Sequence, residues 1–373
     1  MNDYDTNNSN RRKIYFYLRD NELATKQDIA YKLELSLPTV TQYLEGLVEQ
    51  GLVSCANKVA EHKVGGRFPV AYSYITDAKV AVGVDISKHH FESIIVDLDG
   101  NVLKYVSKRI LYRRDDEYLA MLGEEVAKII ELAQVDKNRI LGVGIAVPGL
   151  LDKTKSYVVD GRVIDNSGMT CSEFSKYIPY ETKLIHDSDA SGFAEFWKST
   201  DIHNALYVSL CNSIGCAVFI DNKVYLGDGF FSGEIGHLNL IPDGKKCYCG
   251  QRGCLDPYCN AEVLSNHTGR DLNLFFEKME SGDEKLCKVW DTYLEHLSTA
   301  ITDMRMMYGC TIIVGGYIGY HMKNHMETLY SKVDAKTPFG EKAVTYLYRC
   351  KQKMDSVATG AALYFVEEFL NGV

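Results

Sequence analysis

A short polar segment of the chain holds one histidine and three cysteines within eighteen residues. They are His237, Cys247, Cys249 and Cys254, with nine, one and four residues between them. One imidazole and three thiolates form a closed tetrahedral ligand set, which is typical of structural rather than catalytic zinc. Four unrelated reduced residues in a core are the alternative, but this segment is polar and rich in glycine, unlike core. The sequence therefore predicts a tight loop that holds one structural zinc ion per chain.

Length and composition limit the class of protein further. A chain of 373 residues is too long for one small domain, so we expect two or three. The net charge of −9 lies downstream of Thr76, because nine Lys or Arg balance nine Asp or Glu up to that residue. A neutral module on an acidic body can still bind DNA. Neither a secretory signal nor an apolar run near the ~20 residues of a membrane span is present, which predicts a cytoplasmic protein without a membrane partner.

The first fifty residues predict three short helices. Residues 1–9 are polar, and we expect them to be disordered. A helical period of apolar residues begins near Ile14. Thr25 and Ser36 are suited to cap the second and third helices, and Gly51 is suited to end the third. The tight turn between the second and third helices predicts a helix-turn-helix.

The residues that follow predict two strands and a DNA-binding surface. Residues 52–76 indicate a hairpin around Gly-Gly-Arg, which would be the wing of a winged helix-turn-helix. Polar side chains opposite the apolar stripe of the third helix can reach base edges: Thr39, Thr41 and Gln42. Lys63 and Arg67 at the wing tip suit phosphates or the minor groove. A small helical interaction domain is the alternative. We predict a DNA-binding domain over 1–76 that recognises an inverted-repeat operator as a homodimer or homotetramer.

The remainder of the chain has an α/β pattern. Apolar runs and amphipathic periods predict strands over 80–86, 91–98 and 140–147, a helix over 119–132, and a second similar set from 206 onwards. Periodicity alone supports only the class α/β. We place a first lobe at 77–203 together with the C-terminal helix at 356–373, and a second lobe, which contains the cysteine-rich segment, at 204–355.

Three motifs in the cysteine-rich segment carry a family resemblance. They read Gly233-Glu234-Ile235-Gly236-His237, Cys247-Tyr248-Cys249-Gly250 and Gly253-Cys254-Leu255-Asp256. These motifs closely resemble the zinc segment of ROK proteins, a family of sugar kinases and sugar-responsive transcriptional repressors, and the resemblance extends over nearly the whole chain. It implies a duplicated, two-lobed ATPase fold like that of actin and hexokinase. The N-terminal elements resemble the winged helix-turn-helix of ROK repressors, which ROK kinases lack.

The two loops that would hold ATP phosphates depart from the kinase pattern. Such loops need small residues so that backbone N–H groups can approach the phosphates. ROK kinases have Asp-Ile-Gly-Gly-Thr in the first loop, where this chain has Asp85-Ile-Ser-Lys-His89. They have Gly-Thr-Gly-Ile-Gly-Gly-Gly in the second, where this chain has Cys211-Asn-Ser-Ile-Gly-Cys-Ala217. The lost glycines predict that ATP is not bound productively and that no catalytic residues operate.

The resemblance implies that the sugar side of the cleft is better retained. Asp187 occupies the position of the catalytic base of ROK kinases and can accept a hydrogen bond from a sugar hydroxyl. The full set that the resemblance implies for sugar binding is Gly149, Asn166, His186, Asp187, Glu234, His237 and Asp256. His186 replaces an asparagine of the family, and Asp256 replaces a glutamate, which indicates a different or larger sugar. Ordinary solvated carboxylates remain the alternative for each acidic residue taken singly.

These observations together predict a sugar-responsive transcriptional regulator, most simply a repressor. Its effector would be a sugar or sugar phosphate that binds a kinase-like but inactive body. Two alternatives remain open from the sequence. One is an active, glucokinase-like sugar kinase with an appended DNA-binding domain, and the other is a regulator that has lost ligand binding.

Overall fold

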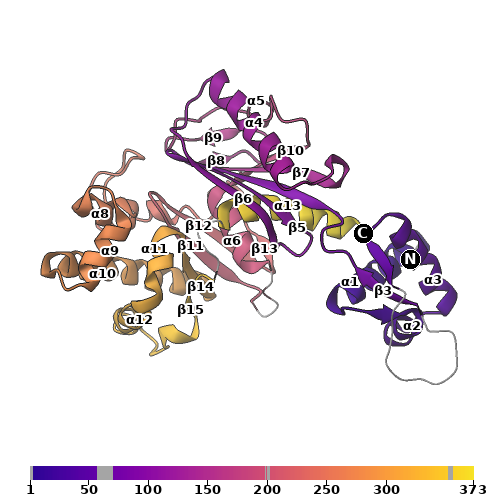
Figure 1. The fold of residues 1–373 in the computed structure, drawn as a ribbon. Coiled ribbons are helices and arrows are strands. Elements are labelled where there is room, and N and C mark those ends of the chain that lie inside the picture. The colour runs from indigo at the N-terminus through magenta and orange to yellow at the C-terminus, as the bar shows by residue number, and fades with distance from the viewer. Residues whose placement is uncertain (1–2, 57–69, 198, 200–201, 352–355) are drawn as a thin grey trace.

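The computed structural model of the chain describes residues 3–56, 70–197, 199, 202–351 and 356–373. A small N-terminal module lies at one end of the molecule, and two larger α/β lobes form the body (Figure 1). Among the described residues, no helix is long and apolar enough to span a bilayer. All eleven cysteines are described, and each is a free thiol.

The N-terminal module is a winged helix-turn-helix, as predicted. Its elements are α1 (Asp3–Asp20), β1 (Ala24–Thr25), α2 (Lys26–Leu33), α3 (Leu37–Glu49), β2 (Val53–Ala56) and β3 (Ala71–Tyr74). The Thr25 hydroxyl accepts a hydrogen bond from the Asp28 N–H, and the Asp28 carboxylate accepts one from the Thr25 N–H, so the capping box is complete. Ser36 caps α3 by accepting from the Thr39 N–H at 3.3 Å. The three strands pair in the order β1-β3-β2, and β1 had not been predicted.

Helix α1 runs from Asp3 to Asp20. Extending a helix costs far less than nucleating one, and the apolar period from Ile14 supplies the nucleus. The disorder expected for residues 1–9 stays a prediction. The wing tip, with Lys63 and Arg67, lies outside the described residues.

The first lobe is built on a five-stranded mixed sheet. Its strands are β4 (Val80–Ile86), β5 (His90–Asp97), β6 (Val102–Arg109), β7 (Ile140–Val147) and β10 (Thr182–His186), in the order β10-β7-β4-β5-β6. Helix α4 (Asp116–Leu132) packs beside β5 and β6, and the C-terminal helix α13 (Ser356–Gly372) packs on β4, β7 and β5. Smaller elements complete the lobe: η1 (Lys137–Arg139), β8 (Leu150–Leu151), β9 (Val158–Asp160), α5 (Cys171–Phe174) and α6 (Asp187–Phe196).

The second lobe repeats this sheet. Its strands are β11 (Ala205–Leu210), β12 (Ile214–Ile220), β13 (Lys223–Val224), β14 (Thr311–Gly315) and β15 (Leu347–Arg349), in the order β13-β12-β11-β14-β15. Its helices are η2 (Ile235–His237), α7 (Asp256–Cys259), α8 (Glu262–Ser265), η3 (Asn266–Thr268), α9 (Leu272–Glu280), α10 (Glu284–Tyr308), α11 (Gly316–His321), η4 (Met322–Asn324), α12 (Met326–Asp334) and η5 (Ala343–Thr345).

The two sheets have the same topology, which confirms the duplicated fold. In each sheet the first strand is central and antiparallel to the second, and it is parallel to the fourth along the chain. Each first strand turns back tightly into the second, so the two equivalent turns, after β4 and after β11, belong to the two loops that hold phosphates in kinases of this fold. The exact limits of the two lobes stay a prediction.

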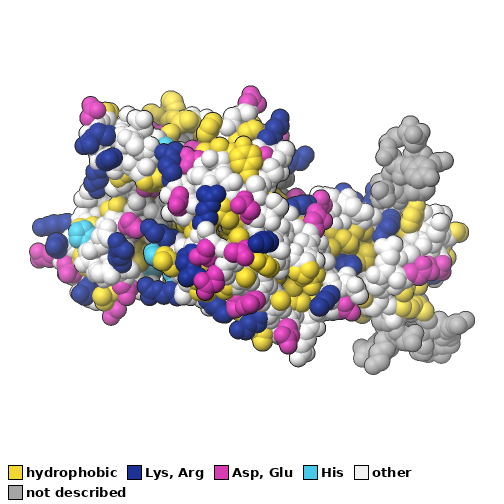
Figure 2. Space-filling model, turned by 90° about the horizontal axis from the view of Figure 1, so that it is seen from above, with side chains coloured by type: hydrophobic (Ala, Val, Ile, Leu, Met, Phe, Trp, Pro, Cys, Tyr) yellow, Lys and Arg dark blue, Asp and Glu magenta, His cyan; other side chains and the backbone are white. Residues whose placement is uncertain are grey.

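Packing joins the N-terminal module to the body. One continuous cluster of buried side chains includes Ile14, Leu18 and Leu47 of the module together with Leu98 and Phe365 of the body. The backbone linker is also paired on both sides, because Ile75 N–H donates to the Leu52 carbonyl and Leu98 N–H donates to the Thr76 carbonyl. The module is therefore docked on the first lobe rather than tethered to it. On the face seen in Figure 2, acidic and basic side chains are interspersed over the body.

Candidate functional site

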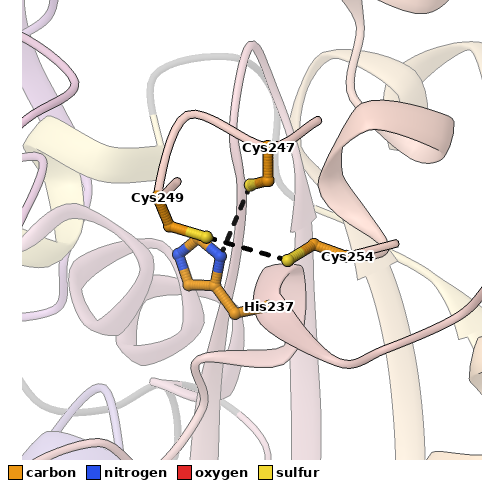
Figure 3. A group of neighbouring side chains, drawn as sticks. All are labelled: His237, Cys247, Cys249 and Cys254. Carbon is orange, nitrogen blue, oxygen red and sulfur yellow. Dashed lines mark hydrogen bonds between the residues drawn. The ribbon is translucent and has the colours of Figure 1, made fainter. Parts of the chain in front are cut away.

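The four predicted metal ligands converge in the second lobe. His237 ends the short helix η2, and the three cysteines lie on the loop between η2 and α7 (Figure 3). Their ligand atoms all lie within 4.8 Å of one another. Cys247 Sγ is 3.7 Å from His237 Nδ1, and Cys249 Sγ is 3.7 Å from Cys254 Sγ.

These separations fit a tetrahedral zinc ion. Sulfur ligands at about 2.3 Å from zinc, at the tetrahedral angle, must lie about 3.8 Å apart. The Cys249–Cys254 separation is close to that value. His237 turns Nδ1 toward the thiols, while its Nε2 lies 3.2 Å from the Tyr248 hydroxyl. A polar partner on the far ring nitrogen fixes the tautomer of a metal-binding histidine. Tyr248 was not predicted, although its place between two ligand cysteines could have indicated it.

Cys259, which is close in sequence, does not join this cluster. It is fully buried on α7, and its thiol points to the Tyr293 carbonyl at 3.9 Å.

The first lobe contacts the loop that carries Cys247, Cys249 and Cys254, which we call the metal loop. Arg162 donates to the Cys249 carbonyl at 3.0 Å and to the Asp160 carboxylate at 2.9 Å. This guanidinium therefore connects the two lobes beside the cysteine cluster.

Asp187 stands at the start of α6, at the end of strand β10. Its carboxylate accepts from the Ser188 N–H at 2.6 Å and lies 3.3 Å from His186 Nε2. On the other side of the imidazole, His186 Nδ1 lies 4.0 Å from the buried Asp189 carboxylate. Burial lowers the pKa of His186, but the Asp189 and Asp187 carboxylates outweigh burial and raise this pKa to about 9. His186 is thus a cation between two carboxylates at neutral pH.

Asn166 and the Pro148-Gly149 turn lie together in the first lobe. Asn166 is fully buried, and its Nδ2 donates to the Pro148 carbonyl at 3.3 Å. Its Oδ1 is buried and has no hydrogen-bond partner among the described residues. An orphaned buried acceptor is costly unless a ligand or water satisfies it. The contact fixes the turn that carries Gly149.

Glu234 and Asp256 are the two acidic residues expected from the second lobe. Glu234 Oε2 lies 3.9 Å from His237 Nε2, beside the cysteine cluster. Asp256 is buried, and its Oδ1 accepts from the Ile214 N–H at 2.7 Å while its Oδ2 accepts from Asn260 at 3.0 Å. Asp256 therefore anchors the turn between β11 and β12, and its contact with a sugar stays a prediction.

The two loops that correspond to kinase phosphate loops lie near each other, because besides burial the Asp85 carboxylate acts on the pKa of Cys211. Burial, and then the Glu92 and Asp187 carboxylates, raise the pKa of Asp85 well above its usual value. Cys211, in the second loop, packs against the turn after β14, where a Cβ on Gly316 would lie only 2.8 Å from its sulfur. Side chains rather than open backbone line this region.

Tyr317 occupies the space next to these loops and was not predicted. It follows the Gly315-Gly316 turn, and it is partly buried on α11. Burial, and then the neighbouring Cys211, Asp85, Glu92 and Asp187 groups, raise the pKa of Tyr317 well above its usual value. Tyr317 also packs against the hydrophobic core of the second lobe.

The predicted DNA-reading residues lie on α3. Gln42 is exposed, whereas Thr39 and Thr41 are partly buried. The Thr39 hydroxyl lies 2.7 Å from the Ser36 hydroxyl, so it also belongs to the helix cap. Val40, Leu44 and Leu47 are fully buried on the opposite face, which leaves Gln42 on the outward side of the helix.

Comparison with known proteins agrees with both parts of this structure. The model of the ROK family matches residues 81–368, and a model described as winged helix-turn-helix DNA-binding matches residues 7–54. The xylose repressor of Bacillus spizizenii is 26% identical over 259 residues, which cover 68% of this chain and 66% of the repressor. The DNA-binding transcriptional dual regulator NagC of Escherichia coli is 24% identical over 257 residues, which cover 68% of this chain and 62% of that protein. The matched region thus spans slightly less than two thirds of these relatives.

Solved structures share the fold. A ROK family transcriptional regulator described as a homologue of the E. coli MLC protein superposes with a TM-score of 0.76 at 20% identity, covering 98% of this chain and 97% of that one. A ROK glucokinase from Streptomyces griseus, in complex with glucose and AMPPNP, gives a TM-score of 0.65 at 18% identity, covering 76% of this chain and 98% of the kinase. With a family model matching most of its length, this chain belongs to the ROK family.

Proposed function

We propose that this protein is a DNA-binding transcriptional repressor whose kinase-like body senses a sugar or sugar phosphate without phosphorylating it. The observation that carries the proposal is a winged helix-turn-helix docked through a continuous core on a ROK body. The relatives named as xylose repressor and NagC support the same function. The effector would bind between Asp187, Asn166 and Glu234, and two chains would bind an inverted-repeat operator.

The cleft favours sensing over phosphoryl transfer. A kinase needs two backbone loops that closely approach the phosphates. Here Lys88 and His89 stand in the first loop, Cys211 packs in the second, and Tyr317 lies beside both. The Asp187 carboxylate can still accept a hydrogen bond from a sugar hydroxyl. Binding of a sugar therefore does not require the glycines that the two phosphate loops have lost.

Zinc would be a structural part of this sensor. His237, Cys247, Cys249 and Cys254 would hold one ion, which would fix the loop that carries His237 next to Glu234. When bound, the ion supplies no chemistry beyond cross-linking this loop. Arg162 of the first lobe donates a hydrogen bond to the Cys249 carbonyl of this loop, so a loop held rigid by zinc would also hold the two lobes together at this point.

Two measurements test the proposed function. The first is enrichment of DNA duplexes from a random pool by the full-length protein, which should yield an inverted repeat. The second is a thermal-shift screen with D-xylose, D-glucose, N-acetyl-D-glucosamine and their phosphates. A sugar at 100 times its dissociation constant should add about 2.7 kcal/mol of stability. Failure to enrich any sequence would refute a DNA-binding regulator, and enriched DNA with no stabilising sugar would indicate a regulator without an effector.

An active sugar kinase is the second candidate, because the position of the catalytic base is retained at Asp187. A coupled assay with ATP, magnesium and each of these sugars separates the two functions. We expect no sugar-dependent turnover. Rates near the ~1–100 per second of typical kinases would overturn the sensing-only function.

A further inference from the structure

The turn between β5 and β6 touches both the DNA-binding module and the helix that starts in the cleft. On one side, Arg19 Nε, in the last turn of α1, lies 2.9 Å from Asp99 Oδ1, and both side chains are partly buried. On the other side, the Trp197 indole N–H, at the end of α6, donates to the Asp99 carbonyl at 3.2 Å. Asp99 of the body is thus bound both to α1 of the DNA-binding module and to the end of α6.

This turn is stiff. The Asp97 carboxylate is buried and accepts from the Asp99 N–H at 2.9 Å, from the Asn101 N–H at 2.8 Å and from the Asn101 amide at 2.9 Å. The Trp197 ring also packs on Gly100, where an added Cβ would lie 3.0 Å from the indole. A displacement of Trp197 therefore moves the turn instead of being absorbed by it.

Helix α6 connects this turn with the cleft and with both lobes. It begins at Asp187 and ends at Phe196, a length of about 15 Å for ten residues. It lies directly against α13 of the first lobe, because a Cβ on Gly360 would fall 1.7 Å from the Ala190 carbonyl oxygen. It also packs against the second lobe, where the Phe196 and Phe219 ring centroids are 4.6 Å apart and a Cβ on Gly215 would lie 1.8 Å from the Ser188 hydroxyl oxygen. A change in the angle between the lobes must move this helix against one of them.

We propose that Asp99 couples the cleft to the DNA-binding module, because Trp197 holds its carbonyl and Arg19 holds its carboxylate. The inference rests on the proposed function and names the residues through which a sugar acts on DNA binding. Sugar binding at Asp187 shifts α6, Trp197 carries the shift to the turn, and the Arg19–Asp99 ion pair carries it to α1. Asp99 and Trp197 are positioning residues, since neither is part of the sugar or DNA contact set.

The chain offers a matched control for this connection. Arg12, also on α1, donates to Asn371 on α13 at 2.9 Å in an exposed contact. That contact joins the same two parts of the molecule without passing through Asp99. Arg12→Gln and Arg19→Gln therefore each remove one guanidinium group from α1. Only Arg19→Gln should affect the coupling between sugar binding and DNA binding. Trp197→Phe removes the indole donor while keeping a ring, and Arg19→Lys keeps the charge.

The experiment measures the response factor, which is the affinity for DNA without sugar divided by the affinity with sugar. The DNA probe is the duplex enriched by the wild-type protein, and the sugar probes are D-xylose, D-glucose and N-acetyl-D-glucosamine, each tested separately. For a wild-type factor of about tenfold or more, within the usual range of allosteric coupling, Arg19→Gln and Trp197→Phe should reduce it below about threefold. Arg12→Gln and Arg19→Lys should keep it. Sugar affinity, measured by thermal shift, should be unchanged in all four.

Retention of the wild-type factor by Arg19→Gln and Trp197→Phe would overturn the proposal. A second measurement decides the case in which DNA binds but these sugars have no effect. The chain has two tryptophans, so Trp290→Phe leaves Trp197 as the only tryptophan, whose emission is excited at a wavelength that tyrosine does not absorb. Adding the duplex should then shift its emission, and the further change Arg19→Gln should abolish the shift. An unchanged emission spectrum would refute the coupling, whereas absence of any DNA binding would refute the proposed function itself and the coupling with it.

Discussion

His186 is one of the residues at which this chain departs from the sugar kinases of its family. An asparagine at this position is neutral, whereas His186 Nε2 lies 3.3 Å from the Asp187 carboxylate and His186 Nδ1 lies 4.0 Å from the Asp189 carboxylate. The pKa of His186 is raised to about 9, although burial alone would lower it. The charge therefore partly neutralises the two carboxylates in the region where we place the effector. This single replacement of a neutral asparagine by a charged histidine therefore changes the electrostatic potential around Asp187.

The raised pKa of His186 predicts how stability depends on pH. Because the folded-state pKa is about 9 and the usual value is 6.5, the folded state holds the proton more tightly. The stabilisation is fully present below pH 6.5 and is lost as pH rises through 9. We expect the free energy of unfolding of wild type to exceed that of His186→Asn by on the order of 1–3 kcal/mol at pH 6, and the difference to shrink by pH 10. Denaturant melts across this range measure it.

A stability difference between wild type and His186→Asn that stays constant with pH would show that His186 is not held as a cation.

The metal loop is the element whose sequence pattern and structure agree most closely. Removing one ligand should release the ion, because three remaining donors bind zinc far more weakly than four. We expect about one zinc per chain in the wild-type protein and much less in Cys254→Ala, measured by elemental analysis after purification without added zinc. Cys259→Ala should keep its zinc, since that thiol points to Tyr293. A zinc-free, folded wild-type protein would contradict the site.

Helix α3 is the element that should carry DNA sequence preference. Gln42 is exposed, and its amide can pair bidentately with adenine, a contact worth about 1–3 kcal/mol of discrimination. We expect Gln42→Ala to relax preference at one base pair of each half-site, as measured by competition among duplexes with single substitutions. Arg67→Ala, in the predicted wing, should instead weaken binding to all sequences similarly and flatten the salt dependence of binding. Unchanged preference in Gln42→Ala would remove this residue from base reading.

At the scale of the whole molecule, the buried cluster shared by the module and the body determines how the two parts unfold. Side chains such as Leu18 and Leu98 belong to one apolar cluster, so neither part can unfold without exposing the other. We expect calorimetry to show the N-terminal module unfolding together with the first lobe. Hydrogen exchange near the transition should show α1 and β5 losing protection at the same temperature. A separate transition for the module, at a lower temperature, would indicate a tethered domain.

Local sequence patterns were sufficient for features whose residues are close together in the chain. The four metal ligands fall within eighteen residues, and the caps at Thr25 and Ser36 act within three residues, so spacing alone predicted them. The duplicated fold came from the family resemblance, because periodicity by itself supported only α/β. The expected disorder of residues 1–9 stays a prediction, because composition alone does not register that a neighbouring helix can extend at low cost.

Only the tertiary structure decided which distant residues meet. It ties Asp256 to the Ile214 N–H and places Tyr317 near Asp85. It also brings Arg19 to Asp99, eighty positions further along the chain. No periodicity or motif encodes such pairs, because they follow from how two sheets and one module pack after their local structure has formed. The sequence determined most of the helices and strands and the four residues that could hold a metal ion, whereas packing determined which residues of the two lobes and the DNA-binding module meet.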